Sequence, residues 1–135
     1  MPPTFQKGEI TIKIAPGELL DKITILQIKT ERISDSEKLK NVKIELDILN
    51  QAKHDHIPES QEITDLETQL KHINETLWDI EDNCRECERH NQFNDRFIDL
   101  TRSVYKTNDK RAAIKKQINL LLKSDIIEEK SYARY

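Results

Sequence analysis

The stretch Ile63–Cys87, ITDLETQLKHINETLWDIEDNCREC, decides the fold of this 135-residue chain. Its apolar residues follow one another in alternating steps of three and four: Ile63, Leu66, Leu70, Ile73, Leu77, Ile80, Cys84 and Cys87. This spacing is typical of a long helix that packs one seam against a partner helix, as in a coiled coil.

A second stretch further along the chain keeps the same spacing, and a short turn at 91–94 separates the two. Its seam positions are Phe97, Leu100, Val104, Thr107, Arg111, Ile114, Ile118 and Leu121. Helices joined by so short a connection pack against each other in opposite directions. The two stretches therefore predict a long antiparallel helical hairpin.

The chain before Ile63 predicts a shorter hairpin. Residues 17–33 carry an apolar stripe wide enough for a helix that is buried on two sides. Residues 36–53 carry a narrower stripe, and the segment His54–Pro58 reads as a loop. We expect helices at 17–33, 36–53, 59–90 and 95–123, followed by a tail at 124–135.

Residues 9–14, EITIKI, alternate β-branched and polar side chains, which predicts a short strand. A single strand needs a partner, and the candidates are the tail near 126–127 or the same strand of a second copy. The expected fold is all-α in one domain, 1–135. It consists of a short hairpin packed on a long one, like a four-helix bundle, with one N-terminal strand.

Composition narrows the classes of function. Charged residues make up 35% of the chain, but the net charge is -3, so no basic surface for nucleic acid is expected. No apolar run is long enough for a membrane span, and the first residues lack the apolar core of a signal peptide. We therefore expect a cytoplasmic protein, and two cysteines without an export signal favour reduced thiols.

One cluster of polar residues is a candidate site. In an antiparallel hairpin the polar positions beside both seams share one flank. The candidate cluster comprises residues of this flank and the seam residue Arg111: Asn74, Glu81, Arg85, Tyr105, Asn108, Arg111 and Lys115. Arg111 occupies a seam position, where a cation is costly unless it is paired, and Glu81 and Asn74 are the acceptors we expect. The cluster is either a hydrogen-bond lattice that fixes helix register or a pocket for a small anion.

Other polar motifs are weaker, and we predict neither a metal nor a cofactor. Both sulfurs of Cys84-Arg-Glu-Cys87 fall on the seam, where cysteine behaves as a small apolar residue. His54 and His56 lie in the predicted loop. The acidic stripe Asp79, Asp82 and Glu86 resembles the magnesium-binding helices of all-helical nucleotide pyrophosphatases, which need converging carboxylates from two helices.

Three blocks of the sequence resemble a known protein family. They are Pro16–Lys29 (PGELLDKITILQIK), Leu77–Asp82 (LWDIED) with Arg85 and Glu88, and Arg102–Lys115 (RSVYKTNDKRAAIK). Together they resemble a family of small, functionally uncharacterised proteins of bacteria and their viruses. The resemblance covers nearly the whole chain, and it implies no activity and no functional residues.

A fainter resemblance connects Leu19–Leu26 and Arg32 with the first helix of all-helical chorismate mutases. Two hypotheses of function follow. The first is a non-enzymatic helical interaction or assembly module, which we expect to form a homodimer or to bind a larger protein partner. The second is a small all-α enzyme or sensor with an anionic metabolite in a chorismate-mutase-like or nucleotide-pyrophosphatase-like pocket at Arg111. The catalytic residues of such an enzyme stay unknown.

Overall fold

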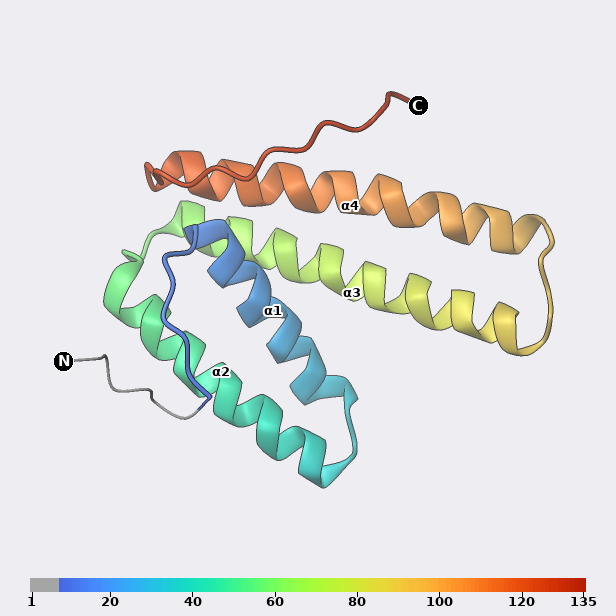
Figure 1. Ribbon diagram of the computed structural model, residues 1–135, viewed down its shortest axis with the longest axis horizontal. Helices are drawn as coiled ribbons and strands as arrows, with labels where there is room; N and C mark the ends of the chain where they lie inside the picture. The colour runs from blue at the N-terminus through green and yellow to red at the C-terminus, as the bar shows by residue number, and fades with distance from the viewer. Residues whose placement is uncertain (1–7) are drawn as a thin grey trace.

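The computed structural model describes residues 8–135, and its regular elements are four helices (Figure 1). They are α1 (Pro16–Arg32), α2 (Ser36–His56), α3 (Gln61–Arg89) and α4 (Asp95–Leu121). The predicted all-α, bundle-like fold is confirmed at this level.

Local chemistry sets where the helices begin. The side chain of Asp35 accepts hydrogen bonds from the backbone N–H groups of the first turn of α2, and Ser60 and Asn94 do the same for α3 and α4. These contacts satisfy N–H groups that have no partner within the helix. The long helices are separated by a tight turn in which Asn91 adopts a positive φ of 52°, a conformation that asparagine tolerates.

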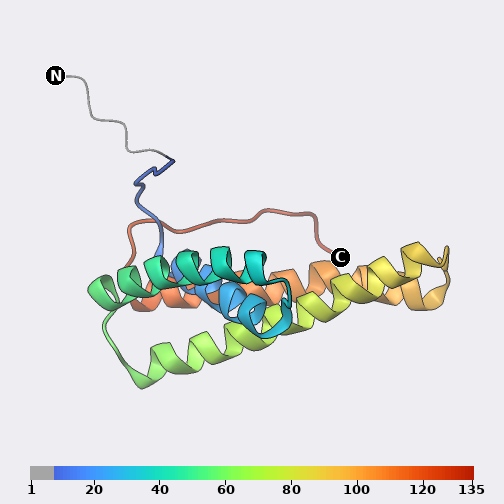
Figure 2. The ribbon, with the colours of Figure 1, turned by 90° about the horizontal axis from the view of Figure 1, so that it is seen from below.

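Helix α1 lies at the centre of the molecule. Its backbone packs closely against each of the other three helices, whereas the backbone of α2 packs closely against α1 only among the described helices. Helix α2 reaches α3 through an ion pair between Lys53 and Glu67 at 2.9 Å. Figures 1 and 2 show α1 between α2 on one side and the long hairpin of α3 and α4 on the other. The wide apolar stripe of α1 is buried on both sides as predicted, with Leu20, Ile23 and Ile28 almost fully enclosed.

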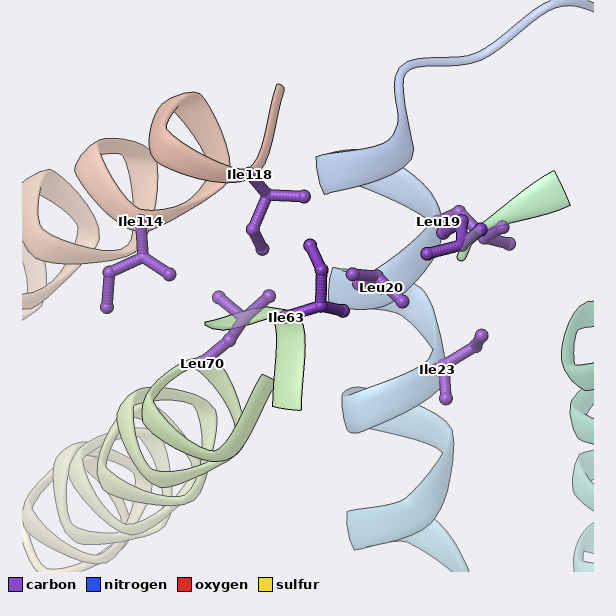
Figure 3. Close-up of a cluster of buried hydrophobic side chains, with 8 residues drawn as sticks. Leu19, Leu20, Ile23, Ile63, Leu70, Ile114 and Ile118 are labelled. Carbon is purple, nitrogen blue, oxygen red and sulfur yellow. The ribbon is translucent and has the colours of Figure 1, made fainter. Parts of the chain in front are cut away.

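The core forms where α1 meets the end of the long hairpin at which α3 begins and α4 ends. Figure 3 shows side chains from three helices pointing toward one another there. The buried cluster comprises Leu19, Leu20, Ile23, Ile57, Ile63, Leu70, Ile114 and Ile118. Burying apolar area of this kind is the main favourable term in folding, and this end of the molecule therefore holds most of the stability.

The predicted antiparallel hairpin of α3 and α4 is present, and α4 is continuous from Asp95 to Leu121. Its far end extends beyond α1 and α2 (Figure 1). We call residues 81–105, which include the turn, the distal half of the long hairpin. Cys87 is the only buried residue in this segment, all of which the structure describes.

The prediction of a strand at 9–14 was wrong, because no strand forms within residues 8–135. The candidate partner segment in the tail runs beside α4 instead, so residues 9–14 have no neighbouring strand to complete a ladder. Their isoleucines lie in solvent, with Ile10 86% and Ile12 70% exposed. Figure 2 shows this segment leading away from the helices.

The helix ends differ by a few residues from the expected ones. The largest difference is at α2, which continues through His54 and His56 to end where Ile57 turns into the core. The two histidines therefore lie in the last helical turn and not in a loop. Lys53 lies in the same last turn, where its positive charge is favourable because the helix dipole places partial negative charge at this end.

The C-terminal tail runs back along α4 (Figure 1). The Lys115 Nζ lies 3.0 Å from a carboxylate oxygen of Glu128, and Lys116 pairs with Glu129 at 3.2 Å. At the end of the chain the Tyr135 hydroxyl donates a hydrogen bond of 2.9 Å to Asp109. The tail thus covers one side of α4 as far as the edge of the distal half.

Candidate functional site

The polar centre of the molecule is an ion pair between α1 and α4. Asp21 is 1% exposed, and its carboxylate accepts a hydrogen bond of 2.9 Å from Nε of Arg111. A second guanidinium nitrogen of Arg111 contacts the other carboxylate oxygen. This two-point geometry is the strongest form of arginine–carboxylate contact, and it fixes the relative position of the two helices.

Helix α3 joins the same pair through Asn74. The Asn74 side-chain nitrogen donates to a carboxylate oxygen of Asp21 and to the Thr24 hydroxyl, both at 2.9 Å. The hydroxyl of Thr24 in turn donates to the backbone carbonyl of Asp21 at 2.8 Å. Three helices therefore meet in one hydrogen-bonded cluster, and we call Asp21, Thr24, Asn74 and Arg111 the Asp21 cluster.

Lys115 forms a second layer one turn further along α4. Its amine donates to Glu18 at 2.7 Å and to Glu128 at 3.0 Å, and it lies 4.0 Å from Asp21. Burial lowers the pKa of Lys115, but the hydrogen bonds to Glu18 and Glu128 outweigh this effect and hold the pKa above its ordinary value. The hydrogen bond to Asp21 likewise raises the pKa of Arg111.

The start of α1 approaches α4 closely at Gly17. The Gly17 N–H donates a hydrogen bond of 2.7 Å to the side-chain oxygen of Asn119, which is 1% exposed. A Cβ atom at Gly17 would lie 2.5 Å from the backbone oxygen of Lys115 and 2.8 Å from the Asn119 oxygen. Only glycine fits this contact, which seats the first turn of α1 on α4.

Every buried side-chain nitrogen and oxygen in residues 8–135 has a hydrogen-bond partner. The Asp21 carboxylate and the Arg111 guanidinium balance each other in charge. A buried, fully paired network of this kind specifies how helices align, and it leaves no unmatched charge to attract an anion. The arrangement fits the lattice reading of the polar cluster.

A hollow of about 400 Å³ lies beside the cluster, between α1 and α3. Its lining residues are Ile25, Ile28, Asn74, Leu77, Trp78, Glu81, Asp82, Arg85 and Arg111. Arg32 at the end of α1 borders it, with its guanidinium 5.9 Å from the centre of the Trp78 ring and 2.5 Å from Asp79. We call this feature the Trp78 hollow. Its two arginines and two carboxylates balance in formal charge.

The seven predicted site residues fall into three places. Four of them line the Trp78 hollow: Asn74, Glu81, Arg85 and Arg111. Tyr105 and Asn108 line a separate hollow of about 660 Å³ between α4 and the tail. Lys115 belongs to the layer with Glu18. The prediction of Glu81 and Asn74 as acceptors for Arg111 was partly wrong. Asp21 accepts the hydrogen bonds of Arg111 directly, and Asn74 reaches Arg111 only through Asp21. Within residues 8–135, Glu81 forms no hydrogen bond with Arg111.

The sequence analysis missed the acidic half of the network. Asp21 and Glu18 come from α1, whereas the search was confined to the two seams of the long hairpin. A signal was present, since Gly17, Asp21, Thr24 and Ile28 recur at steps of four, three and four. A carboxylate on the stripe of a helix that is buried on two sides needs a cation opposite it, and Arg111 is the seam cation.

The cysteines and histidines are not gathered into a metal-binding set. Cys84 is half-buried, Cys87 is buried, and Arg96 donates a hydrogen bond of 3.1 Å to the Cys87 sulfur. Burial, followed by the charge of Glu81, raises the pKa of the Cys84 thiol, which disfavours the reactive thiolate. Within residues 8–135, no three His, Cys, Asp or Glu side chains are placed to hold a metal.

Comparison with known protein families identifies the family of this chain. A family model described as "Family of unknown function (DUF6165)" matches residues 10–135. The chain belongs to this family. The resemblance found in the three sequence blocks is thereby confirmed, and the DUF6165 description supplies no activity. Neither the curated proteins nor the solved structures contain a match to the chain. In the part of this DUF6165 member that the structure describes, no helix combines the length and apolarity needed to span a bilayer.

Proposed function

We propose that this protein is a non-enzymatic helical interaction module that assembles through the distal half of its long hairpin, first of all with a second copy of itself. The observation that carries the proposal is the burial pattern. No residue from 88 to 113 is buried, although the segment includes most of α4. Helices in water owe most of their stability to the packing of an apolar face, and this part of the hairpin has only one layer.

The distal half presents apolar side chains that a partner would cover. Ile98 is 50% exposed, Phe93 at the turn is 52% exposed, and Tyr105 is 42% exposed. Ile98 and Tyr105 are seven residues apart on α4 and therefore lie on one face. The seam residues Leu100 and Val104 are only half-buried. Covering such a face recovers about 25 cal/mol for each Å² of apolar area.

A competing apolar surface lies on α2, where Ile44 is 53% and Ile48 is 59% exposed. These two side chains stand one helical turn apart, and Val42 on the same helix is already buried against the molecule. Single exposed apolar residues are common on protein surfaces. The distal half differs because both of its helices lack a covering layer along their whole length.

Sedimentation equilibrium tests the proposal with a matched pair of variants. Ile98→Glu puts a charge on the distal half, and Ile44→Glu puts the same charge on a side chain of nearly equal exposure on α2. We expect the wild type and Ile44→Glu to form a dimer as concentration rises, and Ile98→Glu to stay monomeric. If Ile44→Glu abolishes association and Ile98→Glu does not, α2 is the interface and the proposal is wrong.

A second candidate function is that of a small enzyme or sensor that binds an anionic metabolite in the Trp78 hollow. The position of Arg85 and Arg111 on its wall favours this candidate. Its weakness is electrostatic, because Asp21 occupies Arg111, and Glu81 and Asp82 add negative charge to the same wall. An anion would have to displace or face these carboxylates.

Thermal denaturation with nucleotides, sugar phosphates and aromatic carboxylic acids distinguishes this candidate. Arg85→Ala is the suitable variant, because Arg85 is a surface residue whose removal leaves the fold intact. A compound that binds in the hollow raises the Tm of the wild type more than that of Arg85→Ala. If every compound shifts both proteins equally, the metabolite site does not exist.

A further inference from the structure

We infer that two copies of this chain pack their distal halves antiparallel, so that the turn of each long hairpin covers the Trp78 hollow of the other. This inference rests on the proposed function and specifies its partner and its register. The two-fold axis passes near Arg85, with α3 lying on the partner's α3 and α4 on the partner's α4. Three features of the uncovered surface support this arrangement: its extent, its pattern of charge and its area.

The uncovered surface has a definite boundary at each end. Helix α1 covers α3 as far as Trp78 and Asp79, where its last residue, Arg32, pairs with Asp79. The other boundary is the turn that contains Phe93. A partner hairpin that covers this whole length without colliding with α1 must place its turn beside Trp78. The two-fold relation then places both turns in equivalent positions, with the axis midway between Trp78 and Phe93.

The charges on this surface are complementary to themselves in that register. Glu81, Arg85 and Glu88 recur at steps of four and three, so they share one face of α3. Arg85 is 80% exposed on its side chain, and its only ion-pair partner in residues 8–135 is Glu81 at 4.0 Å. With the axis close to Arg85, the two Arg85 side chains face each other, and each also lies within one turn of the partner's Glu88, which offsets the like charge. Opposite charges therefore meet twice by symmetry.

The apolar side chains fit the same register. Ile98 lies six residues after Gln92 and Glu86 lies six before it, so Ile98 is level with the axis and meets the equivalent region of the partner's α4. The register places Phe93 at the Trp78 hollow, whose apolar lining includes Ile25, Ile28 and Leu77. The two most exposed apolar groups of the distal half are thus covered at the centre and at the ends of the interface.

The area is sufficient for a weak dimer. From Trp78 to the turn the hairpin is about 20 Å long, and two helices side by side are about 20 Å wide. Each copy thus contributes about 400 Å² in projection, and side chains make the accessible area larger than the projection. The pair therefore buries about 800 Å² in projection and somewhat more in accessible area, which is the size of a weak interface below about 1,200 Å² in total. A dimer of this size forms and dissociates with concentration.

Exchange of charges between the two copies tests the register by sedimentation equilibrium. We expect Arg85→Glu alone and Glu88→Arg alone to lose the dimer, because positions 85 and 88 then carry the same charge and the attraction between Arg85 and the partner's Glu88 becomes repulsion. An equimolar mixture of the two variants restores it. Lys43→Glu on α2 is the control, since it makes the same change of charge on an exposed helix outside the interface and keeps the dimer. All three positions are exposed, so folding is preserved.

Fluorescence tests the docking of the turn, because Trp78 is the only tryptophan of the chain. As the dimer forms, we expect Trp78 emission to shift to shorter wavelength and acrylamide quenching to fall, with neither change in Arg85→Glu. A wild-type dimer with unchanged Trp78, or charge variants that the mixture fails to restore, overturns this register while the assembly function stands. A wild type that is monomeric at every concentration overturns both.

Discussion

Asp21 is central to the packing of the helices, because its one carboxylate connects three of them. It accepts hydrogen bonds from Arg111 on α4 and from Asn74 on α3, while it belongs to α1. Removing one member of a buried ion pair leaves the other charge without compensation. The free energy of unfolding therefore depends on the pair as a unit and not on either residue by itself.

A double-mutant cycle measures this dependence. We expect Asp21→Ala and Arg111→Ala each to lower the free energy of unfolding by about 3–5 kcal/mol. The double variant should lose clearly less than the sum of the two, since it leaves no unpaired charge. Arg85→Ala, at an exposed arginine with only a loose contact, should change stability by less than about 0.5 kcal/mol. Strictly additive losses in urea titrations would show that the pair is not coupled.

Arg111 was predictable from the sequence as a buried cation, but its partner Asp21 was not. Arg111 is recognisable from the sequence as a seam cation that needs a partner, and Asn74 as one of its neighbours. The partner itself was not recognised because Asp21 is 90 residues away and approaches across the interface between α1 and the long hairpin. Periodicity reports which face of a helix is buried, but it does not report which residue of another helix lies against it.

At the scale of elements, α1 is the helix on which the packing of the others depends. It packs closely against all three of the other helices, and its first turn lies directly on the backbone of α4 at Gly17. The long helices were predictable because their seams recur over many turns. The strand at 9–14 was predicted wrongly. A strand forms only when it pairs with another, and the candidate partner in the tail lies on α4 instead.

Gly17→Ala tests the seating of α1. Replacing glycine by alanine within a helix ordinarily stabilises a protein by about 0.4–1 kcal/mol. At Gly17 we expect the opposite sign, a loss of about 1–3 kcal/mol, because the added Cβ would overlap the Lys115 carbonyl oxygen and the side chain of Asn119. Thermal unfolding gives the sign directly, and a rise in Tm would mean that α1 and α4 are not in close contact there.

On the scale of the whole molecule, the protein is asymmetric in its packing. One end holds the apolar core and the Asp21 cluster, and the other end is a bare pair of helices. The flank of the long hairpin that carries Asn74, Arg85 and Tyr105 is covered unevenly. Only the part near Asn74 and Trp78 is covered by α1, while Tyr105 contacts just the end of the tail and is 42% exposed. This incomplete covering is the basis of the assembly proposal.

Amide hydrogen exchange at several protein concentrations tests that proposal most directly. Exchange of peptides that cover residues 88–105 should slow as concentration rises through the dimer transition, because a second copy then protects the distal half. Exchange in α2 should stay constant, since α2 lies outside the proposed interface. Exchange in 88–105 that does not depend on concentration, or slowing confined to α2, would contradict the account.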